Sequence, residues 1–136
     1  MYYKSQIQNQ RYYYNYLGFY KAVKRKNHIV IEAFLDAGFD PNSKWMGKPL
    51  VFYTVQKHDN RAFNMFLSHL VDLDIQTNNS NLLFYSIHNG NSFVVKTLIK
   101  NKVDVNKIFK KDGVQILHMS GLIAAMSKQT TKFCLD

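Results

Sequence analysis

The chain has 136 residues, of which 46% are hydrophobic and 15% aromatic, and its formal net charge is +9. This length and composition exclude wholesale disorder and predict a single domain over residues 1–136. No apolar run reaches the roughly 20 residues that cross a bilayer, so we expect no membrane insertion. The start lacks the apolar stretch of a secretion signal, and the lone cysteine, Cys134, suits a reducing compartment. Together these features predict a cytoplasmic protein.

The first part of the chain divides into a polar start and a helix. Residues 1–11 carry no apolar pattern, so we expect them to be frayed. From Tyr12 to Lys26, apolar and aromatic residues recur at three- and four-residue steps, which predicts an amphipathic helix. Asn27 ends this run.

A second helix is predicted from about His28 to Ala37. Large apolar residues fill five of the seven positions that follow His28: Ile29, Val30, Ile31, Phe34 and Leu35. A helix that is apolar on so many sides does not suit exposure to water, so we expect it to bury all five residues. Gly38 then occupies the left-handed position that ends many helices, and Asp40-Pro41-Asn42 predicts a turn.

Two more helical pairs follow, each split by a short polar turn. Their expected helices are 49–57 with 61–70, and 82–88 with 92–100. Proline at position 49 suits the first turn of a helix. A partial fourth unit begins at Asp112-Gly113 and continues through Leu117-His118, and a last helix is expected from Thr130 to Leu135.

The chain repeats this pattern. Residues 19–42 align without a gap on residues 83–106. The offset between these two segments is about two periods of roughly 33 residues, the length of one repeat class. One helical hairpin cannot bury its apolar face alone, so such repeats are expected to stack.

The pattern resembles the ankyrin repeat, in which two helices are followed by a Gly-Ala-Asp-Val-Asn turn. The residues that carry the likeness include Gly38, Asp40, Asn42, Gly47, Pro49-Leu50, Phe66-Leu67, Leu83, Gly90, Val94-Val95, Asp104-Val105-Asn106, Gly113 and Leu117-His118. The Thr-Pro-Leu-His signature of the family is intact nowhere. The resemblance covers residues 19–136. It implies an all-α, ankyrin-like solenoid of stacked helix-turn-helix repeats, with about three full units and a partial or capping fourth.

The sequence contains no persuasive catalytic or metal-binding pattern. Its five histidines form no cluster with each other or with cysteine, and no glycine-rich phosphate loop occurs. The acidic pair Asp72 and Asp74 is typical of a turn. We therefore expect no enzyme, no metal and no cofactor.

The resemblance also implies where a partner would bind, because ankyrin-like stacks meet partners at finger tips and at the exposed edge of first helices. By position, the helix residues are Lys24, Arg25, Gln56, Lys57, His88 and Asn89. The tip residues are Lys44, Trp45, Met46, Asn78, Asn79, Ile108, Phe109 and Lys110. Trp45 and Phe109 are the main candidates, since aromatic anchors are typical of interface hot spots. Each is either folded back as a loop anchor or kept for a partner's pocket.

These observations predict a non-catalytic module that binds one protein with an acidic surface through a basic concave face. An inhibitor or immunity-type protein of bacterial origin, or a fragment of an effector, would fit. The alternative is nucleic-acid binding by the Tyr- and Lys-rich start, which has no acid before Glu32, and by the six lysines from Lys96 to Lys111. A third possibility is a structural segment of a longer repeat protein. Charge alone does not choose among them.

Overall fold

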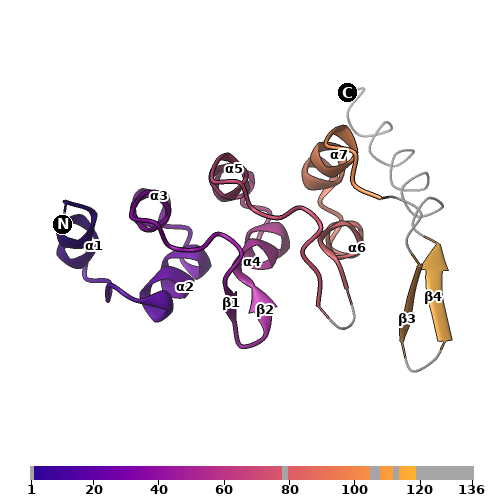
Figure 1. Ribbon diagram of the computed structural model, residues 1–136, viewed down its shortest axis with the longest axis horizontal. Coiled ribbons are helices and arrows are strands. Elements are labelled where there is room, and N and C mark those ends of the chain that lie inside the picture. The colour runs from indigo at the N-terminus through magenta and orange to yellow at the C-terminus, as the bar shows by residue number, and fades with distance from the viewer. Residues whose placement is uncertain (1, 78–79, 105–107, 112–113, 119–136) are drawn as a thin grey trace. The chain divides into compact units, whose positions relative to one another are not determined.

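A computed structural model describes residues 2–77 and 80–104, and the backbone of residues 108–111 and 114–118 (Figure 1). Over these residues the chain is mostly helical, with seven α-helices and two short β-hairpins. It divides into two compact units, Met1–Asp72 and Leu73–Asp136. Whether the chain forms the single domain expected from its length stays a prediction.

The first unit begins with a helix that the sequence does not predict. Helix α1 (Tyr2–Asn9) packs against α3 (His28–Asp36) and buries Ile7 completely. The expected frayed start is therefore corrected for these residues. A helix with a single buried isoleucine shows no apolar periodicity in its sequence. Its stability comes from packing on α3 and not from its local sequence.

Helix α2 (Tyr16–Lys24) begins later than the start at Tyr12 that its periodicity predicts. Asn15 caps it: the side-chain oxygen accepts a hydrogen bond from the Gly18 backbone N–H at 2.9 Å. The helix buries Phe19 and its neighbours Ala22 and Val23 against the rest of the unit. The tyrosines that suggested an earlier start lie outside the helix or at its partly exposed beginning.

Helix α3 shows the expected apolar face with one exception. Val30, Ile31, Phe34 and Leu35 are buried, but 61% of Ile29 is exposed. The expectation that all five large apolar residues are covered is wrong for Ile29. Helical geometry places Ile29 on the same stripe as Glu32 and Asp36, and both of those residues face water.

The second hairpin of the unit packs directly on the first. Strands β1 (Lys44–Trp45) and β2 (Lys48–Pro49) pair antiparallel and form a short finger that leads into α4 (Leu50–Gln56) and α5 (Asn60–Ser68). Helix α2 contacts α4 and α3 contacts α5, so the two hairpins lie side by side (Figure 1).

A stack of buried phenylalanines joins the two hairpins. Phe19 of α2 lies 5.2 Å from Phe34 of α3 and 5.8 Å from Phe66 of α5, measured between ring centroids, and both pairs are stacked. All three residues have no exposed surface. Burial of each large apolar side chain contributes about 1.5–3 kcal/mol, so this stack is a main source of stability for the unit.

The second unit contains a third hairpin with the limits that the sequence predicts. Helices α6 (Leu82–His88) and α7 (Ser92–Lys100) pack on each other and bury Leu82, Leu83, Val94, Val95 and Leu98. A bridge between Gln76 and Asn81 precedes them.

The unit also contains a β-hairpin where the family pattern predicts the start of a fourth helical repeat. Strands β3 (Ile108–Lys111) and β4 (Val114–His118) pair antiparallel, with a register shift between Phe109 and Lys110. Leu117 and His118, placed above in a partial fourth repeat unit, thus end a strand. Alternating apolar and polar residues in 114–116, after the Asp-Gly dipeptide, are typical of a hairpin. The expected helix 130–135 lies outside the described residues.

Local geometry recurs at even steps along the chain. The second helix of each hairpin is capped by Asn27, Asp59 and Asn91 in turn. Each cap accepts a hydrogen bond from the backbone N–H three residues later, at 3.3, 3.2 and 3.1 Å. Asp59 lies midway between the other two caps, and the spacing from Asn27 to Asn91 equals the offset of the two aligned sequence segments. That offset therefore spans two structural periods.

The left-handed positions follow the same period. Residues with positive φ precede the three caps: Lys26 (57°), His58 (54°) and Gly90 (67°). Others follow the three second helices: Gly38 (98°), Leu70 (62°) and Lys102 (62°). Glycine adopts this conformation freely and other residues do so at a cost, so the backbone geometry is maintained even where its preferred residue is missing.

Candidate partner-binding surface

The β1–β2 finger lies on an aromatic base supplied by α2 and α4. The Trp45 ring stacks on Tyr20, with centroids 5.3 Å apart and planes 18° apart. Tyr20 meets Tyr53 edge-on, also at 5.3 Å, and the Tyr53 hydroxyl donates to the Trp45 carbonyl at 3.4 Å. We call Tyr20, Trp45 and Tyr53 the finger platform. All three residues are half-buried, so part of the platform remains exposed.

The platform shows one of the two roles that the sequence left open for Trp45, and contact of its exposed part with a partner stays a prediction. Its ring folds back and anchors the finger to α2. Aromatic pairs in these geometries contribute about 0.5–1.5 kcal/mol beyond burial. The finger is therefore held in a fixed position, although it is formed by only two residues on each strand.

Two lysines cover the platform. The Lys48 ammonium lies 4.4 Å from the centroid of the Tyr53 ring and donates to the Gln56 side-chain oxygen at 2.7 Å. The Lys24 ammonium lies 5.8 Å from the Tyr20 centroid. A cation over an aromatic face is attracted by the electron-rich ring, so both charges are positioned by the platform.

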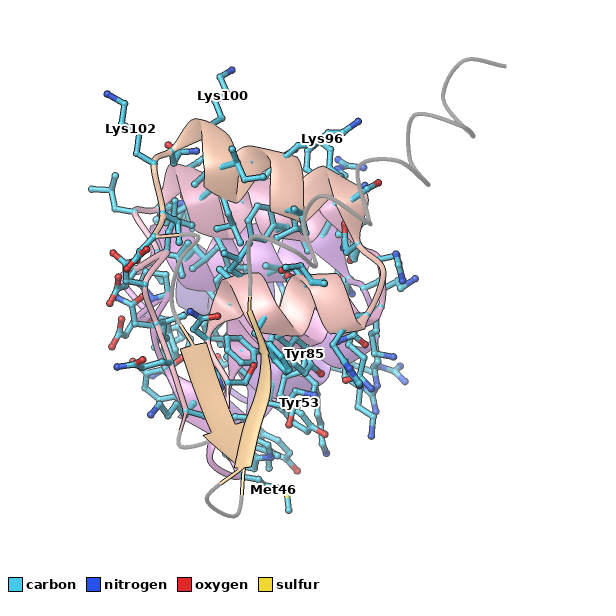
Figure 2. All side chains as sticks on the ribbon, turned by 90° about the vertical axis from the view of Figure 1, so that its right-hand side faces the viewer. Met46, Tyr53, Tyr85, Lys96, Lys100 and Lys102 are labelled. Carbon is cyan, nitrogen blue, oxygen red and sulfur yellow. The ribbon has the colours of Figure 1, made fainter. Side chains whose placement is uncertain are left out.

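The tip of the finger exposes a large apolar side chain. Met46 and Gly47 form the two-residue loop between β1 and β2, with φ angles of 55° and 79°. Positive φ at both loop residues matches a type I′ turn, which favours Asn, Asp or Gly at its first position. Met46 occupies that position and is 87% exposed, pointing away from the helices (Figure 2).

The structure brings together only some of the predicted residues. Those gathered around the finger are Lys24, Lys44, Trp45, Met46 and Gln56. Lys57 is the half-buried C-cap of α4. Arg25 does not belong to this group: its guanidinium lies 5.7 Å from the centroid of the Tyr12 ring, whereas Lys24 lies over Tyr20. The adjacent cations Lys24 and Arg25 therefore serve different surfaces.

In the second unit, the predicted helix residues make local contacts. The exposed His88 ring stacks on Phe84 at 6.3 Å, and the Asn89 side chain donates to the Tyr85 carbonyl at 2.8 Å. Asn78 and Asn79 lie outside the described residues. Ile108, Phe109 and Lys110 belong to β3.

Sequence reasoning missed Tyr20, Lys48 and Tyr53 as members of the surface. Tyr20 lies at the middle of α2 and Tyr53 at the middle of α4, and this shared position was a usable signal. For Lys48 no such signal exists, because a strand of two residues is too short to show alternation. Its direction depends on the ring beneath it.

Two histidine–aspartate pairs in the first unit connect α3 with α5. His28 Nε2 lies 2.8 Å from both carboxylate oxygens of Asp59, and His69 Nε2 lies 3.1 Å from Asp36. The pairs stand at opposite ends of α3, so they fix its position on α5. Within the described residues no three His, Cys, Asp or Glu side chains converge as a metal site requires.

The part of the chain that the structure describes has no helix with the length and apolar character needed to cross a membrane. No protein-family model matches the chain, and no curated protein matches it. The likeness to ankyrin repeats thus rests on the residues and on the recurring hairpins.

Proposed function

We propose that the chain is an ankyrin-like stack of helical hairpins that acts as a non-catalytic protein-interaction module. Two observations support the repeat architecture. Hairpins α2–α3 and α4–α5 pack side by side, and caps and left-handed residues recur at even steps along the chain. In such arrays each unit contacts its neighbours, and an extended surface is available to a partner.

The main observation in support of a binding role is the conformation and exposure of Met46. A non-glycine residue in the left-handed region costs about 1–2 kcal/mol relative to ordinary backbone. The position exposes 87% of a large apolar side chain and gains no packing in return. Leu70 after α5 has the same combination of positive φ (62°) and exposure (85%), so it is the place of Met46 at the tip of an anchored finger that points to binding. Methionine adapts its shape to irregular apolar surfaces, which suits a contact with a partner.

The charge around the finger defines the chemistry of the partner. Residues 41–58 contain no Asp or Glu, while Lys24, Lys44 and Lys48 surround the platform. An acidic protein surface with an apolar pocket for Met46 would complement this arrangement. An inhibitor or immunity-type protein, or an effector segment working in a reducing cytoplasm, fits a module of this kind.

The test separates binding from folding at one position. A photo-crosslinking amino acid replaces Met46, and the captured protein is identified by mass spectrometry; the same group at exposed Asn64 of α5 is the control. Affinity for that protein is then measured for Met46→Gly. Glycine suits the turn, so this variant should be at least as stable as the wild type in urea and yet bind at least tenfold more weakly.

Two results together would contradict a binding role for the finger. Unchanged affinity for Met46→Gly, together with equal crosslinking from position 64, would remove the finger from the binding surface. Trp45→Ala serves as a second variant, because it releases the anchor of the finger. It should weaken binding even though the tip residue is intact.

A second candidate function, nucleic-acid binding, is favoured by the lysines of the second unit. Lys96 and Lys100 are exposed one turn apart on α7, and Lys102 follows the helix (Figure 2). Phosphate contacts by such residues make affinity strongly dependent on salt. A gel shift with random-sequence RNA at two salt concentrations tests this function. Lack of a shift at low salt would rule it out.

A further inference from the structure

The first unit contains a second basic feature, separate from the finger. An open hollow of about 470 Å³ is lined by Tyr12, Arg25, Lys26, Asn27, His28, Ile29 and Arg61. We call it the basic hollow. Its volume falls within the range of ligand sites in proteins. It lies at the turn between α2 and α3 and includes the first turn of α5.

The wall of the hollow is built from ordered side chains. Tyr12 is only 9% exposed, and its hydroxyl accepts a hydrogen bond from the Asn27 side chain at 3.5 Å. The Arg25 guanidinium lies 5.7 Å from the Tyr12 centroid, and His28 is held by Asp59. Arg25 is therefore positioned by a ring that is itself fixed in the fold.

The cations of the hollow have no acidic partners. Among the described residues, Arg25, Lys26 and Arg61 form no ion pair, and all three are exposed. The carboxylate that contacts a residue of the lining belongs to Asp59, which is 7% exposed and already accepts from His28 and from the Ala62 N–H. Like charges gathered without counter-charges repel one another, and an anionic ligand would relieve that repulsion.

An apolar residue joins the cations. Ile29 lines the hollow and is 61% exposed, although the rest of the apolar face of α3 is buried. A free inorganic anion would gain nothing from Ile29. A stacked nucleobase would need an open aromatic face, and Tyr12 is nearly buried beneath Arg25. The combination suits a ligand that carries both carboxylates and an apolar side chain.

We propose that the basic hollow binds an acidic segment of a protein, with a carboxylate held by Arg25 and Arg61 and a neighbouring apolar side chain placed on Ile29. Arginine suits this role because its planar guanidinium can donate two parallel hydrogen bonds to one carboxylate. This site is distinct from the finger, and its existence does not depend on the proposed function of the finger.

The test uses the full chain and a synthetic peptide probe. The probe is a fluorescent peptide of alternating glutamate and leucine, and the matched control peptides carry serine for leucine or glutamine for glutamate. Binding is followed by fluorescence anisotropy, and the site is located by chemical-shift changes of backbone amides in ¹⁵N-labelled protein. We expect the probe to bind and to shift amides at residues 25–29 and 61, and both control peptides to bind at least fivefold more weakly.

The variants separate the hollow from general charge attraction. Arg25→Gln, Arg61→Gln and Ile29→Ser change exposed side chains and should each weaken the probe at least fivefold. Lys96→Gln removes one positive charge from α7, outside the hollow, and should change affinity less than twofold. Circular dichroism confirms that each variant is folded.

Three outcomes would overturn the proposal. Equal weakening by Lys96→Gln would mean that the probe responds to net charge alone. Shifts at the same amides with inorganic phosphate, but none with the peptide, would identify a simple anion site. A single-stranded oligonucleotide could also displace the probe. If it binds the hollow in the Ile29→Ser variant but not in Arg25→Gln, the hollow is a nucleic-acid site.

Discussion

Gly18 stands where any larger residue would collide with the backbone before it. A Cβ added at this position would lie 1.9 Å from the Tyr13 carbonyl oxygen and 3.2 Å from the Phe34 ring. The glycine therefore allows the segment before α2 to turn closely over the helix. Here glycine is required by space and not by its φ angle.

We expect Gly18→Ala to destabilise the protein by about 1–3 kcal/mol, the usual cost of overpacking. This sign is the reverse of the usual helix effect, in which alanine is favoured over glycine by up to about 1 kcal/mol. Urea unfolding followed by circular dichroism measures the change. Asn64→Ala, at an exposed position of α5, is the control and should be neutral or slightly stabilising. A Gly18→Ala variant as stable as the wild type would contradict the close approach.

Residue-level contacts also explain why the candidate surface was only partly predictable. The sequence identifies Trp45 and Met46 as unusual loop residues, and the structure places both in the finger. It does not indicate that Lys24 and Arg25 diverge, since both are exposed cations at one helix end. Lys24 lies over Tyr20, which is one turn earlier on the same helix, whereas Arg25 lies over Tyr12, a residue outside α2 that the fold brings near it.

At the scale of elements, the caps of the second helices connect local sequence with packing. Asp59 caps α5 through the Ala62 N–H and also binds His28 at the start of α3. Asn91 occupies the equivalent place in the third hairpin and caps α7 through the Val94 N–H. The two residues occupy equivalent places in different hairpins, and Asp59 also joins two hairpins of the first unit.

We expect Asn91→Ala to cost about 1 kcal/mol, the typical value of an N-cap. Asp59→Ala should cost more, because it also removes the partly buried hydrogen bond with His28. Asp59→Asn retains the cap and should fall between Asp59→Ala and the wild type. Urea denaturation of the three variants provides the comparison. A loss for Asp59→Ala no larger than the usual cost of an N-cap would show that the contact with His28 adds no stability.

The success of sequence reasoning at this scale depends on where the signal lies. The limits of α6 and α7 were predicted because caps and the Asn89-Gly90-Asn91 turn are local features. Helix α1 was not predicted because Ile7 is its single buried residue, and one residue gives no apolar periodicity. Strand β4 lies where the family pattern predicts a helical repeat, because alternation is limited to residues 114–116 and is too short to predict a strand.

At the scale of the molecule, the hairpins of the first unit depend on each other for their core. Phe66 of α5 stacks on Phe19 of α2, which belongs to the neighbouring hairpin. Repeat proteins derive much of their stability from such interfaces between adjacent units. The hairpins should therefore unfold together and not one at a time.

We expect Phe66→Ala to destabilise the first unit by about 3–5 kcal/mol. Hydrogen exchange measured by mass spectrometry should then accelerate across α2, α3, α4 and α5 together. Phe93→Ala is the control, since Phe93 of α7 is 38% exposed, and should have a much smaller effect. Faster exchange confined to α5 would show that the hairpins are stable independently.

The recurrence of one backbone conformation at residues 26 and 58 has a practical consequence for protein engineering. Lys26 and His58 have nearly the same φ, 57° and 54°, and each directly precedes a capping residue. Splicing Lys26 directly onto Asp59 would therefore excise the segment 27–58 and leave a matching junction. Such a cut removes the finger together with α3 and α4. Duplicating the same segment would lengthen the chain by one module and create one new junction, in which His58 precedes the cap Asn27.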